Sequence, residues 1–308
     1  MVHSVEGVMK LRGVLAPIPT PFRDEAIDLD VLVRNLRFWL GSELCGIVVL
    51  GTNGEAAHVD DDEADLLIAK TREVVPADRT LVAGTAREST RATISATRRA
   101  GALGVDAVLV RTPAFFKSLM TPEALIDHFL AVADASLVPV LLYNIPQVTG
   151  VSLSAETVAR LAEHPNIPGI KESSGNVLQV SQLVSATGPE FQVVVGSAQT
   201  YYASLSVGAV GGILALACVQ PALCARLHQL VVENHPNEAL VLQQQLIPLA
   251  EMVTSRFGVP GLKAAMDLIG VGGGAPRFPL RRCTDDVVQE IRTALTMLEA
   301  SSGVSHSV

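Results

Sequence analysis

Short apolar runs alternate with helix-like segments along most of the chain. Each run is apolar almost throughout and rich in valine, leucine and isoleucine, which is typical of strands covered on both faces in a parallel sheet. The runs occupy eight stretches, at residues 11–19, 45–50, 80–83, 106–110, 138–143, 167–170, 191–195 and 211–214.

The segments between these runs have the spacing of amphipathic helices. Asp28 is a suitable cap for the first of them. Four acidic residues, 60–63, open the second, and we interpret them as a helix start rather than a metal site, because the helix macrodipole favours acidic side chains there. We predict helices at residues 29–40, 60–75, 89–100, 122–133, 154–163, 177–185 and 200–207.

Eight strand–helix units predict an α/β fold of the (β/α)8 TIM barrel type. An open, doubly wound sheet is the alternative, but its first strand should lead into a glycine-rich phosphate loop. The turn after the first run, PIPTPF (17–22), contains no glycine.

After about residue 229 the alternation gives way to three helical segments, at residues 237–257, 261–269 and 284–298. We therefore expect a catalytic barrel over residues 1–230 and a C-terminal three-helix extension over residues 231–308. The last eight residues, SSGVSHSV, are expected to be disordered.

Composition argues against several classes of partner. The net charge is -8 and there is no basic run, so nucleic acid is not expected to bind. The four cysteines lack C-x-x-C spacing and a nearby histidine cluster, which indicates buried thiols in a reducing compartment rather than disulfides or a zinc site. The N-terminus lacks the apolar core of a signal peptide, and we expect a cytoplasmic protein.

One uncharged stretch, residues 191–225, could be read as a membrane span. Several glycines interrupt it, and Pro221 follows its most apolar part. Two buried strands with a short helix between them explain the same pattern, so we expect no membrane association.

Lys171 is the most unusual residue in this pattern, because it stands where an apolar run ends, within GIKESSG (169–175). A lysine at the end of a buried strand is costly unless it is paired or has a lowered pKa. A salt bridge with Glu172 is one interpretation. The other is imine chemistry, because the neutral amine of a lysine attacks carbonyl carbons.

Active-site groups of a TIM barrel lie where strands end and the following loops begin. Tyr143 ends the run before that of Lys171 and could transfer protons, although it could equally be a core tyrosine. GTNGE (51–55) could present N–H groups and a hydroxyl to a carboxylate, or be an ordinary turn. Candidate residues at the strand ends are Thr52, Asn53, Tyr143, Lys171, Ser173, Gly196 and Ile213.

Four motifs in this order resemble the dihydrodipicolinate synthase / N-acetylneuraminate lyase superfamily. They are GTNGE (51–55), YNIPQVTG (143–150), GIKESSG (169–175) and GSAQT…GAVGGI (196–213). The resemblance implies a barrel with a helical extension, assembled as a homotetramer that is a dimer of dimers. It also implies that Lys171 forms a Schiff base with pyruvate or another 2-oxo acid, that Tyr143 relays protons, and that Thr52 and Asn53 bind the substrate carboxylate. No metal or organic cofactor is expected, and the partners are a 2-oxo acid and an aldehyde.

Three departures from the synthase pattern bear on the substrate. Val148 stands where those enzymes carry an arginine that grips a carboxylate, and a valine cannot make that contact. Asn53 replaces a threonine. The segment PAFFKS places Phe115 and Phe116 where a relay tyrosine of the neighbouring subunit is usual.

Other features are similar to the 4-hydroxy-2-oxoglutarate aldolases. They include Asn53, Ser173, VTSRFGVPGLKAAMD (253–267) and GVGGGAPRFPL (270–280), although the last two segments have no predicted catalytic role. The sequence therefore predicts a lysine-dependent aldolase that cleaves 4-hydroxy-2-oxoglutarate or a 2-keto-3-deoxy acid to pyruvate and an aldehyde. The alternatives are a 4-hydroxy-tetrahydrodipicolinate synthase, which condenses pyruvate with aspartate semialdehyde, and a non-catalytic protein that binds 2-oxo acids.

Overall fold

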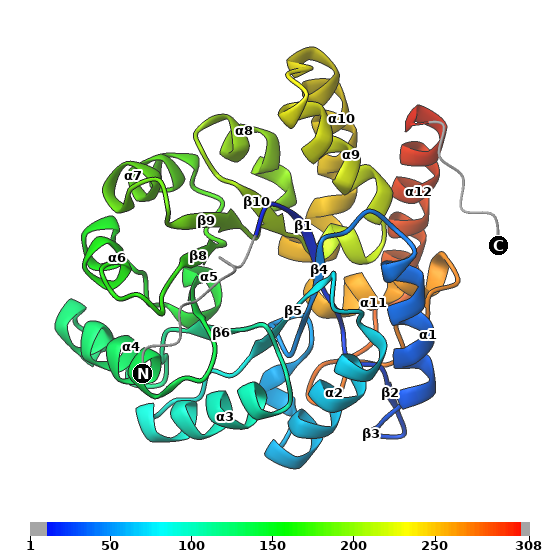
Figure 1. Cartoon of the computed structure of the whole chain (residues 1–308). Helices are drawn as coiled ribbons and strands as arrows, with labels where there is room; N and C mark the ends of the chain where they lie inside the picture. The colour runs from blue at the N-terminus through cyan, green and yellow to red at the C-terminus, as the bar shows by residue number, and fades with distance from the viewer. Residues whose placement is uncertain (1–10, 303–308) are drawn as a thin grey trace.

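Parallel strands form a closed barrel at the centre of the molecule, seen in a computed structural model that describes residues 11–302 (Figure 1). The last barrel strand pairs with the first, so the predicted TIM barrel is confirmed and the open sheet is excluded. In chain order the strands are β1 (Gly13–Pro17), β4 (Gly46–Val49), β5 (Thr80–Gly84), β6 (Ala107–Arg111), β7 (Val140–Asn144), β8 (Gly169–Glu172), β9 (Gln192–Val195) and β10 (Gly211–Ile213).

Helices surround the barrel as an outer ring (Figure 1). Asp60 caps the second of them in a reciprocal capping box with Glu63, which confirms the interpretation of residues 60–63 as a helix start. The ring consists of α1 (Leu29–Leu40), α2 (Asp61–Val74), α3 (Thr90–Ala102), α4 (Pro122–Ala135), α6 (Ala155–Ala162), α7 (Val177–Thr187), α8 (Tyr201–Ser206) and α9 (Pro221–Val232). Shorter elements that were not predicted are the hairpin β2 (Phe22–Arg23) and β3 (Ala26–Ile27), and the one-turn helix α5 (Pro146–Thr149).

Alternation along the strands divides the apolar core into two parts. One set of side chains faces the helices and forms the larger cluster. The other fills the barrel interior with aliphatic side chains, among them Leu15, Val48 and Leu141. Because the interior is packed, a ligand can enter at the ends of the strands but cannot pass through.

The C-terminal helices continue from the barrel side where α9 lies (Figure 1). The helix predicted over residues 237–257 is two elements, α10 (Pro236–Glu251) and a π-helical turn (Met252–Arg256); α11 (Gly258–Leu268) and α12 (Asp285–Ser302) follow. α9 was missed because it continues an apolar run and shows little contrast between its faces. The division of the chain after residue 230 stays a prediction. The last eight residues were expected to be disordered, but the first two of them, Ser301 and Ser302, end α12. The other six, 303–308, and the N-terminal residues 1–10, which carry the signal-peptide expectation, lie outside the described part.

Residues 191–225 are accounted for by β9, α8, β10 and the start of α9. Within residues 11–302, no helix is long and apolar enough to span a membrane.

Stability should depend on pH through His128, which is buried on α4. Burial lowers its pKa to about 4. Between pH 6.5 and 4 the unfolded chain therefore binds a proton that the folded chain does not, and stability falls as the pH drops through this window. We expect His128→Gln to weaken this loss by on the order of 2 kcal/mol between pH 6.5 and 4.5, measured by urea unfolding at those two pH values.

Candidate active site

Tyr143 and Lys171 lie side by side on adjacent strands, because the β7–β8 register pairs them directly. Both side chains point into the mouth of the barrel, and each is about 5% exposed or less. The Lys171 Nζ lies 4.2 Å from the centroid of the tyrosine ring. An amine and a phenol that share one face at this distance can act on the same bound molecule.

Glu172 points away from Lys171, as alternation along the strand requires. Its carboxylate accepts hydrogen bonds from Asn144 Nδ2 at 2.6 Å and from the Ser174 amide at 2.6 Å. The alternative interpretation of Lys171, a salt bridge with Glu172, is therefore wrong. Glu172 instead fixes the turn that follows β8.

The GTNGE loop follows β4 and approaches Tyr143 from the other side. Thr52 Oγ1 lies 3.2 Å from the Tyr143 hydroxyl, and Asn53 Nδ2 donates to Pro17 O at 3.4 Å. Within residues 11–302 the amides of Thr52 and Asn53 donate to no protein acceptor. Leu50 and Glu55, on either side of this turn, both have left-handed backbone geometry with φ of 57° and 53°. Such strain is typical of loops whose shape serves a ligand.

Ser173, Gly196 and Ile213 complete the rim close to Lys171. Ser173 Oγ is buried and has no hydrogen-bond partner in the described part of the chain. A Cβ on Gly196 would overlap Ser173 Oγ and lie 3.1 Å from Lys171 Cε, so glycine is required beside the amine. Ile213 ends β10 and is buried.

All seven residues predicted from the strand ends line one cavity of about 520 Å³. This volume suits a small organic acid. Val148 lies at the cavity edge with 61% of its surface exposed. Phe115 and Phe116 do not line the cavity; they stack edge to face at 5.0 Å and are 78% and 65% exposed.

Four lining residues come from a segment that the sequence prediction gave no role in the site. Thr254 and Ser255 belong to the π-helical turn, and Gly258 and Val259 open α11. The similarity of VTSRFGVPG to the aldolases was the signal that could have indicated them. The C-terminal extension thus forms part of the cavity wall.

A buried ion pair joins the GTNGE loop to α11. Lys263 Nζ lies 2.6 Å from Glu55 Oε1, and both side chains are 1% exposed. Lys263 also donates to the carbonyl oxygens of Thr20 and Ala275, at 2.8 and 2.9 Å. Burial lowers the pKa of Lys263, and the bond to Glu55 opposes this effect. The ammonium therefore has three oxygen partners that compensate for its loss of water.

Arg277 fastens the same loop from a second direction. Its amide donates to Glu55 Oε2 at 2.9 Å, and its guanidinium forms a fork with the carboxylate of Glu63 at 2.6 Å on both arms. It also donates to His58 O at 2.7 Å. The segment after α11 thus holds the GTNGE loop at its last residue, Glu55, and also the start of α2 that follows it.

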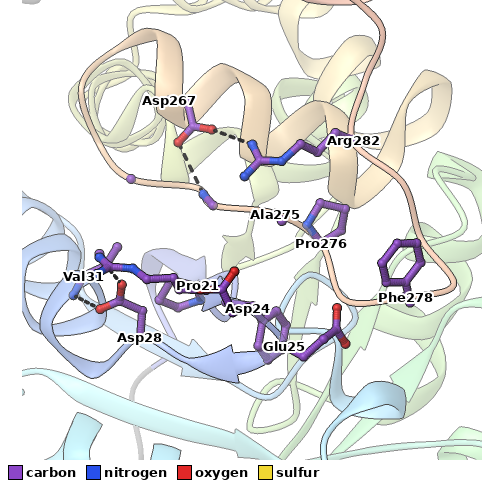
Figure 2. A pocket seen from close by; sticks show the side chains of 14 residues that line it. Pro21, Asp24, Glu25, Asp28, Val31, Asp267, Ala275, Pro276, Phe278 and Arg282 are labelled. Carbon is purple, nitrogen blue, oxygen red and sulfur yellow. Dashed lines mark hydrogen bonds and ion pairs between the residues drawn. The ribbon is translucent and has the colours of Figure 1, made fainter.

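A groove of about 600 Å³ lies nearby, between the β2–β3 hairpin and residues 272–282 (Figure 2). Two of its carboxylates already have partners: Asp28 pairs with Arg23 at 2.6 Å, and Asp267 accepts from the Gly273 amide at 2.7 Å. Its described lining contains no lysine and no end of a barrel strand, so the cavity at Lys171 is the candidate active site.

Comparison with known proteins agrees with this barrel fold. The family model described as "Dihydrodipicolinate synthetase family" matches residues 10–298. A probable mitochondrial 4-hydroxy-2-oxoglutarate aldolase of Emericella nidulans is 35% identical, over 87% of this chain and 88% of that protein. The 4-hydroxy-tetrahydrodipicolinate synthase structure of Methylacidiphilum fumariolicum SolV has a TM-score of 0.92 and 34% identity, over 96% and 98% of the two chains. The chloride-inhibited dihydrodipicolinate synthase of Acinetobacter baumannii, complexed with pyruvate, has a TM-score of 0.90 and 30% identity, over 94% and 99%.

These findings define the class of the protein as an aldolase-type lyase built on a TIM barrel. The chain belongs to the dihydrodipicolinate synthetase family, which confirms the resemblance found in the sequence motifs. The identities to this aldolase and to this synthase are nearly equal, so they do not distinguish the two activities.

Lys263→Met should destabilise the fold by about 3–5 kcal/mol, because it leaves the Glu55 carboxylate buried without its cation. The double variant Glu55→Gln/Lys263→Met should recover a large part of this loss. Urea unfolding measures both. Lys70→Met is the matched control, since it breaks a surface pair with Glu73 and should cost less than about 1 kcal/mol. A loss no larger than that of the control would contradict the role given to the buried pair.

Proposed function

We propose that this protein is a class I aldolase that cleaves a 2-oxo acid to pyruvate and an aldehyde, or joins them in reverse. The favoured substrates are 4-hydroxy-2-oxoglutarate and the sugar-derived 2-keto-3-deoxy acids. The observation that carries the proposal is the pairing of Tyr143 with Lys171 at the barrel mouth, with Thr52 Oγ1 within 3.2 Å of the tyrosine hydroxyl. Family membership supports the same type of chemistry.

Lys171 provides the covalent step. Its neutral amine attacks the C2 carbonyl of the 2-oxo acid, and loss of one water gives an imine. The carboxylate at C1 accepts hydrogen bonds from the free amides of Thr52 and Asn53, which orients C2 toward the amine. Ser173 Oγ, which lacks a protein partner, is available to the same substrate.

Tyr143 moves the protons. It accepts the proton of the C4 hydroxyl as the C3–C4 bond breaks, the aldehyde leaves, and the bond's electron pair passes into an enamine on Lys171. The enamine takes a proton at C3, and one water hydrolyses the resulting imine to pyruvate and free Lys171. No cofactor is needed, because the protonated imine accepts the electron pair.

Reduction with borohydride in the presence of pyruvate tests the imine. We expect a permanent mass increase at Lys171, and we expect Lys171→Arg to lose both the adduct and all cleavage activity, because a guanidinium cannot form the imine. Lys117→Arg, at an exposed lysine near the site, is the control that should retain both. An unlabelled Lys171 in active protein would refute the mechanism, and an adduct without cleavage of any 2-oxo acid would favour a binding protein.

Tyr143→Phe should lower kcat by roughly 10²–10⁴-fold, because it removes the proton-transfer group while keeping the ring against Lys171. Steady-state assays of pyruvate release measure this effect. The imine with pyruvate should still form, although more slowly. An unchanged kcat would show that another group or water carries the proton.

The second candidate function is 4-hydroxy-tetrahydrodipicolinate synthesis from pyruvate and aspartate semialdehyde. The name and similarity of the Methylacidiphilum protein favour it. Val148 argues against it, because the carboxylate of aspartate semialdehyde would meet a neutral side chain at the cavity edge. A condensation assay run beside the cleavage assays separates the two activities.

We also propose a homotetramer, a dimer of dimers, in the cytoplasm. An exposed apolar surface follows β6 and consists of Phe115, Phe116 and Leu119. The family resemblance supports a second copy of the chain as the partner that covers it. Light scattering of the purified protein tests the oligomer. The four free cysteines are consistent with a reducing compartment.

A further inference from the structure

The cavity at Lys171 carries almost no charge. Lys171 and Tyr143 are the ionisable side chains among its described lining residues. All other lining positions are aliphatic residues, proline, glycine, hydroxyl residues or amides. If Thr52 and Asn53 take the C1 carboxylate, no cation remains for a second acidic group.

Neutral polar groups gather in the loops beyond the strand ends. Gln199, after β9, donates from Nε2 to Ser255 Oγ at 3.0 Å. This bond leaves the Gln199 carbonyl oxygen as an acceptor and the Ser255 hydroxyl proton as a donor. Ser174 Oγ accepts from the Asn176 amide at 3.1 Å and keeps its own proton for a ligand. Such groups match sugar hydroxyls, which both donate and accept.

The nearest cations are directed elsewhere. Arg256 follows Ser255 in the chain, but it pairs with Glu290 at 2.7 Å and lies over the ring of Phe257. Lys117 contacts Gly150, is exposed, and is not part of the lining. A second carboxylate in the cavity would therefore lose water without gaining an ion pair.

We propose that the 2-oxo acid processed here has a neutral, hydroxylated tail, and that the aldehyde released is a short hydroxyaldehyde without a carboxylate. Gln199, Ser255 and Ser174 determine this specificity by hydrogen bonding to the tail. This inference rests on the proposed aldolase function and selects the 2-keto-3-deoxy sugar acids over 4-hydroxy-2-oxoglutarate.

The test compares pyruvate release from 2-keto-3-deoxygluconate and from 4-hydroxy-2-oxoglutarate with the full-length protein. We expect kcat/KM to be roughly tenfold or more higher for the hydroxylated substrate. Gln199→Leu should lower kcat/KM for that substrate by roughly tenfold and leave the value for the dicarboxylate almost unchanged. Equal or better cleavage of 4-hydroxy-2-oxoglutarate would overturn the inference.

Val148→Arg provides the converse test, because it places a cation at the cavity edge. It should raise kcat/KM for 4-hydroxy-2-oxoglutarate by roughly tenfold, whereas Val148→Gln, of similar length and without charge, should not. A gain with both variants would show that size, not charge, limits the dicarboxylate, and would contradict the inference.

Borohydride trapping with pyruvate distinguishes a failure of the proposed tail specificity from a failure of the aldolase function. An adduct at Lys171 together with no cleavage of the hydroxylated acid overturns the inference about the tail and leaves the imine chemistry standing. The absence of an adduct refutes the aldolase function itself, and the inference falls with it.

Discussion

The ion pair between Glu55 and Lys263 is the constraint on which the mouth of the barrel depends. Two charges with 1% exposed side chains are tolerable in a protein interior if they are paired and hydrogen-bonded. Lys263 here also donates to two carbonyl oxygens, and Glu55 also accepts from the Arg277 amide. The turn they secure includes residues in left-handed geometry, which is unfavourable for side chains other than glycine. A strained turn keeps its shape when its surroundings fix it from several directions. Lys263 and Arg277 do this, so Thr52 and Asn53 keep their places in the cavity lining.

Much of the fold could be predicted because barrel strands are short, continuous apolar runs with helices between them. The site could be predicted for a related reason: side chains at the ends of parallel strands converge, so Thr52, Tyr143 and Lys171 meet although they are far apart in sequence. The sequence did not predict contacts that leave no periodic pattern of apolar residues. Nothing in the pattern pairs Glu55 with Lys263, and the apolar sequence around α9 hides where one element ends and the next begins. The interpretation of Lys171 as a salt-bridge partner of Glu172 was wrong because consecutive side chains in a strand face opposite sides of the sheet.

The cavity has two parts with different physical character. Near β7 and β8 the side chains are tightly constrained. There is no space for a side chain at Gly196, beside Lys171, and Glu172 fixes the turn after β8. Further out, the wall consists of loops and the π-helical turn, with amides and hydroxyls that can change partners. A TIM barrel allows this division, because strands hold the reacting groups while loops vary. It accounts for a family in which relatives of similar identity to this chain carry different names.

The contacts of Arg277 with Glu55 and Glu63 can form only late in synthesis of the chain. Arg277 lies 222 residues after Glu55, and the last barrel strand ends at Ile213, well before either Lys263 or Arg277 leaves the ribosome. A nascent chain can therefore contain every barrel strand while its GTNGE loop (51–55) is still without these contacts. A chain cut short in this region would contain Lys171 but would lack the part of the cavity wall that residues 254–259 form.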